Sequence, residues 1–408
     1  MSGGFAPFGG GERISLAGRT VLQIIPRLDA GGAERTTIDV AAALVAAGAR
    51  ALVASEGGRL TSELQAVGGL LTPFQAATKN PVAMMLNVRR LARLVRDERV
   101  DIVHARSRAP AWVALAAMRL APRPFVTTFH GAYTGRSALK LRYNSVMARG
   151  DAVIANSQYT ADMIARFYPF AREKVTIIHR GSDFSKFAPA VVDASRVARL
   201  RRAWGAEPQE RIVLLAARLT AWKGQKILIA AAKRLKDAGM VGVRYVLAGD
   251  PQGRGSYAKE LDALIEKGGL RGIVVRVGHC DDMPAAFLAA SVVAVPSTEP
   301  EAFGRSAVEA QAMGAPVVVS DLGAVPETVL APPYATAEER TGWRVPPGDA
   351  PALAEALVNA LSLGASAREA LARRARAHVE RNFSLEHMTR ATLDVYLSVL
   401  EGRSPTLP

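Results

Sequence analysis

Short runs of apolar and β-branched residues alternate with helical stretches along the first half of the chain. The runs predict strands at residues 20–25, 51–54, 102–105, 125–130, 152–156 and 175–178. Between them, stretches such as 34–47 and 82–96 have the apolar spacing of an amphipathic helix. Regular alternation of strand and helix is typical of parallel sheets built from α/β units.

The same pattern begins again in the second half of the chain. Further strands are predicted at residues 211–217, 244–248, 273–278, 292–296 and 316–320. Residues 188–210, between the halves, are polar and charged and have no strand pattern. We therefore expect two domains of similar architecture, with a boundary near residue 190.

Residues that favour helix ends refine this prediction. Ser366 and Glu369 have the spacing of a capping box, which would begin a helix running to about Val379. Ser384 is a second N-cap candidate and would begin the last helix. Gly314 and then Pro316 would end the helix that follows Glu301.

Length and composition agree with two soluble domains. The chain has 408 residues, of which 49% are hydrophobic, and no apolar run approaches the length of a membrane span. The N-terminal residues 1–19 are predicted to be a flexible Gly-rich tail without a signal sequence. The single Cys280 excludes a disulfide framework and a multi-cysteine metal site, so we expect a cytoplasmic protein.

Positive charge is concentrated in one part of the chain. The net charge is +15, and residues 79–149 alone contribute a net +11. Such a region attracts phosphate, whether on nucleic acid, an anionic membrane or a phosphorylated substrate, although a basic surface can also serve solubility.

A predicted helix in this basic region has two kinds of residue on different faces. Over residues 82–96, Val88, Leu91, Leu94 and Val95 share one face, while Arg89, Arg90, Arg93 and Arg96 occupy the rest. An ordinary helix packed on its domain explains this pattern. The alternative is reversible, salt-sensitive contact with an anionic membrane, without insertion.

Two strand-to-helix turns have the residues of an anion site. Gly31 and Gly32 follow the first strand and would let a ligand approach the backbone closely, although the dinucleotide fingerprint is absent. Arg218 and Lys223 flank the turn after residues 211–217. Two cations there can bind one pyrophosphate at the carboxyl edge of a parallel sheet.

A third candidate segment follows the strand at 292–296. Glu301 lies in its loop, and Glu309 lies on the following helix among apolar neighbours, so we expect a hydroxyl-bearing ligand such as ribose to partner Glu309. The backbone amides of Phe303, Gly304 and Arg305 would lie at the helix N-terminus, where an anion binds. His130 ends a strand of the first half, again at a ligand-binding edge.

Taken together, these motifs resemble the retaining glycosyltransferases of family 4, which have the GT-B fold. The resemblance covers nearly all of residues 20–400. It rests on five motifs in the family's order: GGAE at 31–34, the histidine of FHG at 129–131, VIANS-x-x-T at 153–160, the Arg218/Lys223 pair, and the Glu301/Glu309 pair with seven residues between them. VPPGD at 345–349 also fits.

The resemblance implies two Rossmann-like domains facing across a cleft. It assigns residues 20–190 to the acceptor domain, 191–383 to the nucleotide-sugar donor domain, and 384–408 to a helix packing back on the first domain. The diphosphate would contact Arg218 and Lys223, the ribose Glu309, and the donor sugar Glu301, with the amides of residues 303–305 nearby. His130 would lie beside the reacting sugar, and Gly31 and Gly32 beneath the diphosphate. No cofactor and no metal are implied.

The sequence departs from the family pattern at Arg180, where the family often has Asn-Gly-x-Asp around this position. The additional cation suggests a phosphate or carboxylate on the acceptor. By resemblance, the reaction is transfer of a hexose from a UDP- or GDP-sugar to a lipopolysaccharide-core or lipid-linked envelope glycan. The enzyme would then work at the inner face of the cytoplasmic membrane.

Two alternatives stay open at this point. A nucleotide-sugar epimerase can share the fold, although it would use a different set of acidic and basic residues. A nucleic-acid-binding protein is suggested by charge alone. No zinc-finger, helix-turn-helix or RNP pattern supports it, so we expect no nucleic-acid partner.

Overall fold

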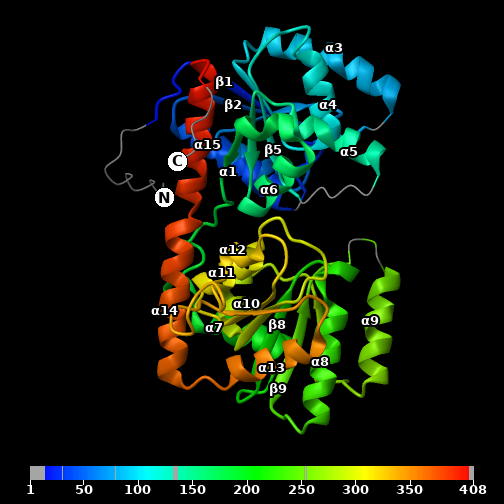
Figure 1. Cartoon of the computed structure of the whole chain (residues 1–408), viewed down its shortest axis with the longest axis vertical. Helices are drawn as coiled ribbons and strands as arrows, with labels where there is room; N and C mark the ends of the chain where they lie inside the picture. The colour runs from blue at the N-terminus through cyan, green and yellow to red at the C-terminus, as the bar shows by residue number, and fades with distance from the viewer. Residues whose placement is uncertain are drawn as a thin grey trace. The chain divides into compact units, whose positions relative to one another are not determined.

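The structure is a computed structural model that describes residues 14–29, 31–78, 80–131, 137–251, 253 and 255–403 (Figure 1). The N-terminal tail predicted for residues 1–19 therefore lies outside the described residues as far as residue 13. Near its end, Leu16 is buried, and its backbone N–H donates to Ala47 O at 2.9 Å. The last residues of the predicted tail thus pack against the sheet domain that follows.

The chain forms two compact units, and each is assembled from separate segments of sequence. The first unit extends to Ala155 and also contains Ala161–Ile178 and the chain from Met388 onward. The second contains Asn156–Thr160 and His179–His387. Along the sequence, the second unit thus begins earlier than the boundary expected near residue 190.

A seven-stranded sheet forms the centre of the first unit, with the order β3-β2-β1-β4-β5-β6-β7 and all neighbours parallel. Its strands are β1 (Thr20–Ile24), β2 (Arg50–Ser55), β3 (Leu70–Pro73), β4 (Ile102–Ala105), β5 (Phe125–Phe129), β6 (Ala152–Ala155) and β7 (Val175–Ile177). In the register, Val21 of β1 pairs with Ala51 on one side and Ile102 on the other. The inner strands are buried throughout, which explains their continuous apolar sequences.

The second unit has a six-stranded parallel sheet with the order β10-β9-β8-β11-β12-β13. Its strands are β8 (Arg211–Ala216), β9 (Val243–Ala248), β10 (Val274–Gly278), β11 (Val292–Val295), β12 (Val317–Ser320) and β13 (Trp343–Val345). Alternate residues of β8 enter different hydrophobic cores: Val213 and Leu215 join one, and Ile212 and Leu214 the other. Helices must therefore cover both faces of this sheet.

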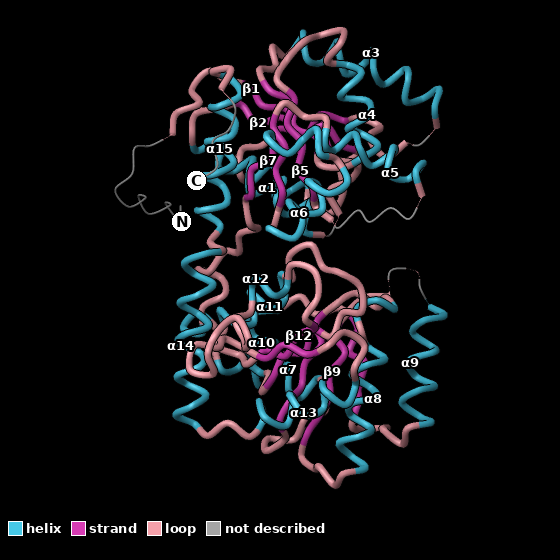
Figure 2. Tube along the Cα trace, viewed as in Figure 1, coloured by secondary structure: helices cyan, strands magenta, loops and turns pink. Residues whose placement is uncertain are grey.

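Helices connect the strands in both units and flank the sheets (Figure 2). Those up to the end of the first sheet are α1 (Gly32–Ala46), α2 (Thr61–Ala66), α3 (Pro81–Asp97), α4 (Arg108–Ala117), α5 (Ala138–Asn144) and α6 (Gln158–Phe167). The later ones are α7 (Ala194–Ala203), α8 (Gln225–Asp237), α9 (Gly255–Lys267), α10 (Met283–Ala289), α11 (Arg305–Ala312), α12 (Val325–Thr328), α13 (Ala350–Leu361), α14 (Ala365–Asn382) and α15 (Leu385–Leu400). Strand and helix alternate as the sequence predicts.

The strand order reverses once in each sheet, and this determines where ligands can bind. In the first unit β1 lies between β2 and β4, and in the second β8 lies between β9 and β11. Successive connections leave these strands on opposite sides, so a crevice opens outside their carboxyl ends. The loops after β1, β4, β8 and β11 are therefore the expected ligand-binding loops.

Two strands and one helix were missed by the sequence analysis. β3 and β13 are edge strands of four and three residues, partly exposed, so neither has a long apolar run. The connector at 188–210 contains α7, which begins at the N-cap Asp193 and buries no residue completely. Its Val197 and Leu200 nevertheless pack against a core of the second unit. Elements that bury few side chains have a weak apolar pattern, so the periodicity of the sequence does not predict them.

The predicted helix ends fared differently. Ser384 does cap α15, since its Oγ accepts the N–H of His387 at 3.2 Å. Gly314 follows α11 with a φ of +74°, as expected of a helix-ending glycine. The capping box at Ser366 is wrong: α14 begins one residue earlier, at Ala365, and Glu369 pairs with Arg373 instead.

We predict that Ser384→Ala and Ser366→Ala differ in their effect on stability. Loss of the Ser384 cap should lower the free energy of unfolding by about 1 kcal/mol. Ser366→Ala, which removes no cap, should change it by less than about 0.5 kcal/mol. Urea unfolding of both variants measures this difference, and equal effects would contradict the assignment of the caps.

Candidate active site

The loops after β8 and β11 bring a lysine and a glutamate together in the second unit. Lys223 Nζ lies 2.9 Å from Glu301 Oε1, and the two side chains are only 16% and 10% exposed. The Ser297 hydroxyl donates to the same Glu301 oxygen. This cluster lies outside the carboxyl ends of the two strands where the order reverses, which is the expected place for a ligand.

Close packing of the two loops holds this cluster in place. Gly224 follows Lys223 with a φ of +76°, and a Cβ there would lie 1.8 Å from Pro296 O in the other loop. The N–H of Thr298 also donates to Trp222 O at 2.8 Å. Only glycine at position 224 permits this approach, and α8 begins directly after it.

A third loop, which follows β12, fixes the backbone of Glu301. Residues Glu301 and Gly323 form a short parallel bridge, and Ala324 N–H donates to Glu301 O at 2.9 Å. A Cβ at Gly323 would lie 2.5 Å from that oxygen. Glu301 is therefore held at its backbone by the loop after β12 and at its carboxylate by Lys223.

The next residues begin helix α11. Gly304 is the N-cap, with a φ of +85°. Phe303 is buried, and its ring lies 5.3 Å from that of Phe383 in an edge-on arrangement. Phe303 is thus an anchor for the loop, while the first backbone amides of α11 lack partners within the helix. The anion-binding role of these backbone amides stays a prediction.

Glu309 lies on α11, and the protein itself supplies a partner for its carboxylate. Arg305 Nε donates to Glu309 Oε1 at 2.9 Å, one turn earlier on the helix. Burial raises the pKa of Glu309, and the Arg305 guanidinium partly opposes that rise. The sequence-based prediction of a ligand hydroxyl as partner left out a signal that was available, the i,i+4 spacing of Arg305 and Glu309 on one helix.

The remaining cations of the second unit lie in different surroundings. Arg218 is exposed, and its side chain forms no ion pair with any residue that the structure describes. Its backbone carbonyl accepts Gln225 Nε2 at 2.9 Å. Arg180 follows His179, whose Nε2 lies 3.0 Å from Glu327 Oε2. Arg218 is therefore the exposed cation of the loop after β8, whereas Lys223 is largely buried in its pair with Glu301.

Three predicted site residues belong to the first unit. His130 directly follows β5, and Gly31 and Gly32 stand at the start of α1, after β1. These positions are at the carboxyl edge of the first sheet, as the sequence predicted. Residues 30 and 132–136, which flank them, lie outside the described part of the chain.

Sequence reasoning missed Ser297 and Glu327. Ser297 directly follows Pro296 after a buried strand, so a polar residue at the carboxyl edge was its available signal. Glu327 accepts the N–H groups of Gln158 and Tyr159, at 2.7 and 2.8 Å, and so caps α6. Partners 169 residues apart leave no local signal in the sequence.

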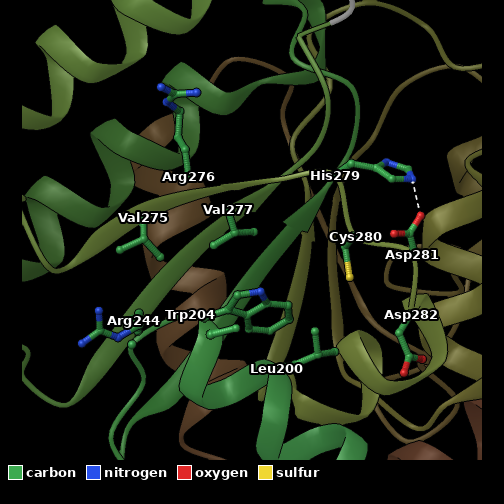
Figure 3. A pocket seen from close by; sticks show the side chains of 12 residues that line it. Leu200, Trp204, Arg244, Val275, Arg276, Val277, His279, Cys280, Asp281 and Asp282 are labelled. Carbon is green, nitrogen blue, oxygen red and sulfur yellow. Dashed lines mark ion pairs between the residues drawn. The ribbon is translucent and has the colours of Figure 1, made fainter.

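The second unit also has a cavity of about 750 Å³ at the edge strand β10. Figure 3 shows Trp204, Val277 and Cys280 around it, with His279 and Asp281 paired at 2.9 Å beside it. None of the predicted site residues lines this cavity. Burial raises the pKa of the Cys280 thiol, which keeps it protonated and poorly nucleophilic.

Neither a metal site nor a membrane span is found in the described parts of the chain. No three His, Cys, Asp or Glu side chains there are grouped so that they could hold a metal ion. None of the described helices combines the length and the apolar character needed to cross a bilayer. The predicted independence of metal stays a prediction.

Two family profiles match the chain. "Glycosyltransferase Family 4" matches residues 30–186, and "Glycosyl transferases group 1" matches residues 197–378. A D-inositol 3-phosphate glycosyltransferase of Xylanimonas cellulosilytica is 33% identical over 261 residues, which are 63% of this chain and 59% of that protein. One of Salinispora tropica is 34% identical over 62% of this chain and 52% of its own. The chain thus spans less than two thirds of the length of these relatives.

Solved structures extend the likeness to both units. A glycosyltransferase from Rickettsia africae is 32% identical with a TM-score of 0.84, over 94% of this chain and 99% of that one. HepE of Anabaena, solved with UDP-glucose, is 27% identical with a TM-score of 0.80, over 93% and 99% of the two chains. WaaG, a glycosyltransferase involved in lipopolysaccharide biosynthesis, is 16% identical with a TM-score of 0.69, over 92% and 99%, and shares the fold alone.

We predict that Glu309→Gln changes how stability depends on pH. Since burial raises the Glu309 pKa, the folded state binds this proton more tightly than the unfolded chain does. The stability that the group contributes is complete below its unfolded pKa of about 4.3 and is lost as the pH rises through the higher folded value. Glutamine cannot ionise, so the variant should gain stability relative to the native protein as the pH rises from about 4 to 7.

Urea unfolding at several pH values measures this gain. Glu355→Gln, at an exposed position on α13, is the matched control and should give a difference that does not vary with pH. A Glu309→Gln difference that is equally flat would contradict the burial of a charged carboxylate.

Proposed function

Because the chain belongs to the family 4 glycosyltransferases and has their GT-B fold, we propose that it transfers a hexose from a nucleoside-diphosphate sugar with retention of configuration. The observation that carries this proposal is the Lys223–Glu301 pair at the carboxyl edge of the second sheet. A cation for a leaving diphosphate and a carboxylate for sugar hydroxyls stand 2.9 Å apart there. Charged donors and acceptors in fixed positions bind both halves of such a donor.

In the reaction, the bond between the anomeric carbon and the diphosphate oxygen breaks, and the acceptor oxygen bonds to that carbon. The acceptor's hydroxyl proton leaves with the nucleoside diphosphate. Negative charge grows on the leaving diphosphate, so Lys223 and the exposed Arg218 stabilise the transition state more than the ground state. The amides of Gly304 and Arg305 add partial positive charge at the start of α11.

Other residues bind the remainder of the donor in this proposal. Glu309 accepts hydroxyls of the ribose, and Arg305 holds its carboxylate in place. From the first unit, we assign His130 to the reacting sugar, and Gly31 and Gly32 to close approach of the backbone to the diphosphate. These three roles come from the family motifs.

We propose a UDP-sugar as the donor, with a GDP-sugar as the alternative. HepE, which shares 26–27% of its sequence with this chain, was solved with UDP, with UDP and glucose, and with UDP-glucose. Cations bind the leaving diphosphate here, so we propose that transfer proceeds without a cofactor and without a metal. Activity that persists in EDTA would support the latter point.

For the acceptor, we propose a lipopolysaccharide-core or lipid-linked envelope glycan that carries an anionic group. The first unit has a cavity of about 650 Å³ at the carboxyl ends of β2 and β3, lined by Glu56, Gln75, Asn87 and Arg90 among others. Polar side chains of both charges suit a hydroxylated, anionic ligand. Arg180, where the sequence departs from the family pattern, is a separate reason to propose an anionic group on the acceptor.

A second candidate acceptor is a phosphorylated polyol. The curated relatives that are 33–34% identical are named D-inositol 3-phosphate glycosyltransferases, and the same basic residues suit a phosphate. Transfer assays with a UDP-hexose and each acceptor class in turn distinguish the two. Product from the soluble polyol phosphate alone would make the lipid-linked proposal wrong.

Helix α3 supports peripheral attachment to the inner face of the cytoplasmic membrane. Leu91 and Val95 are buried as predicted, and Val88 and Leu94 pack on the same core. The structure adds a feature that the helical pattern did not predict: Val82, Met85 and Leu86 are 63%, 65% and 50% exposed. Exposed apolar side chains beside exposed arginines fit an anionic lipid surface better than arginines alone.

We predict that Lys223→Ala and Glu309→Ala nearly abolish transfer while the protein stays folded. The first removes charge from the leaving diphosphate, and the second leaves ribose hydroxyls without an acceptor, which weakens binding by about 1–3 kcal/mol. Lys226→Ala and Glu260→Ala are matched controls, because this ion pair lies nearby on α8 and α9 and is more exposed.

Transfer rates and thermal unfolding with UDP-, GDP- and ADP-sugars measure these effects. A bound donor at 100 times its dissociation constant should stabilise the native protein by about 2.7 kcal/mol, and both site variants less. Turnover near the native rate in either site variant would make the site assignment wrong.

A further prediction concerns membrane binding through α3. Arg89→Glu with Arg93→Glu should sharply reduce binding to anionic vesicles, because each basic residue near the surface contributes about 1 kcal/mol. Native binding should weaken at several hundred millimolar salt and be slight on neutral vesicles. Co-sedimentation with liposomes measures this binding.

Arg202→Glu with Lys259→Glu is the matched control, since it changes the net charge equally at exposed sites of the second unit. If these two control substitutions reduce vesicle binding as much as the two α3 substitutions do, then the net charge of the protein, and not helix α3, is responsible for membrane binding.

A further inference from the structure

A series of hydrogen-bonded, buried polar side chains crosses the first unit and reaches β5, the strand directly before His130. His104 on β4 is fully buried, and its Nδ1 lies 2.7 Å from the hydroxyl of Tyr396 on α15. Its other ring nitrogen, Nε2, lies 2.7 Å from Thr128 Oγ1 on β5. A histidine bonded at both nitrogens by neutral hydroxyls is held in one orientation.

Arg106 determines which way the hydrogen bonds of this chain point. It follows β4, is 2% exposed, and donates its Nε–H to Gln23 Oε1 at 3.0 Å. Its guanidinium also lies beside Tyr396, close enough to act against the rise that burial causes in the tyrosine pKa. A guanidinium has no acceptor, so in that contact the Tyr396 oxygen must accept. The hydroxyl proton of Tyr396 is therefore free to donate to His104.

The protonation states of the two rings agree with this direction. Burial raises the pKa of Tyr396 to about 12, so its hydroxyl keeps its proton at neutral pH. Burial lowers the pKa of His104 well below its usual range, and the charge of Arg106 lowers it further. The imidazole is therefore neutral and carries one proton. With Nδ1 accepting from Tyr396, that proton is on Nε2 and is donated to Thr128.

The same donor-to-acceptor direction extends from His104 to Thr128. Because Thr128 Oγ1 accepts from His104, the Thr128 hydroxyl has its own proton left for another acceptor. Thr128 lies on β5 two residues before His130, which directly follows the strand, and positions two apart along an extended backbone share one face. His130 also lies near enough to His104 for its charge to lower the His104 pKa.

We infer that Tyr396 is a positioning residue that fixes His104 as the Nε2–H tautomer and thereby holds Thr128 and the end of β5, with His130, in one hydrogen-bonding state. The role in transfer rests on the proposed function, in which His130 stands beside the reacting sugar. Tyr396 itself is too deeply buried to touch a substrate. The last helix thus supplies a residue on which the site of the first unit depends.

Nitrogen-15 spectra of the histidine rings test the tautomer directly. The chain has six histidines, so the signals can be assigned by single substitutions. We expect His104 to carry its proton on Nε2 in the native protein, and in Tyr396→Phe to shift toward the Nδ1–H form. The titration midpoint of His130 should move in Tyr396→Phe and in Thr128→Val, and return toward the native value in Thr128→Ser.

Thr392→Val is the matched control. It removes a buried hydroxyl from α15 one turn before Tyr396, where Thr392 Oγ1 donates only to Met388 O at 2.8 Å. We expect it to leave the His104 tautomer and the His130 titration unchanged. In transfer assays, Tyr396→Phe should lower kcat roughly tenfold, with the KM for the donor within about twofold, because orientation rather than donor binding is lost.

Several results would overturn the inference. One is a native His104 that carries its proton on Nδ1. Another is a His130 titration that is the same in the native protein, Tyr396→Phe and Thr128→Val. A loss of activity in Thr392→Val as large as that in Tyr396→Phe would indicate that any change in the packing of α15 lowers activity. If the native protein transfers no sugar, the proposed function fails, while the histidine spectra still decide the hydrogen-bond chain.

Discussion

The close contact between the loops after β8 and β11 is the constraint on which the candidate site depends. A glycine at position 224 lets one loop touch the carbonyl of Pro296 in the other. That contact places Lys223 beside Glu301 at the point where the strand order reverses. Two largely buried opposite charges stabilise one another only in good geometry. The backbone packing of the two loops therefore determines the geometry of the Lys223–Glu301 ion pair.

The parallel sheets could be predicted from the sequence because buried strands are continuous apolar runs. β4, for example, has the bounds that the pattern gives it. β3 and β13 could not be predicted, since edge strands bury too little surface to need such a run. Motif residues were correctly placed at the carboxyl edges because strand direction alone fixes that edge. The interaction partners of these residues could not be predicted, because the Lys223–Glu301 ion pair joins residues from separate loops.

Buried polar contacts explain most of what periodicity could not predict. Arg106 is one of the basic residues that the charge count over 79–149 includes, yet it is buried and donates to the neutral Gln23. Arg89 and Arg93 on α3 stay exposed. Charge counts alone cannot separate these cases. A cation of structural importance and a cation for a partner therefore look identical until the fold is known.

The first unit closes with residues from the far end of the chain, and this has a consequence for synthesis. Tyr396 bonds His104, 292 positions earlier, and everything from His179 to His387 belongs to the other unit. On the ribosome, the first sheet therefore emerges long before the helix that covers His104 and Arg106. While the second unit is being synthesised, the side chains of His104 and Arg106 therefore lack the neighbouring Tyr396. The first unit therefore acquires this buried hydrogen bond only after residue 396 has been made.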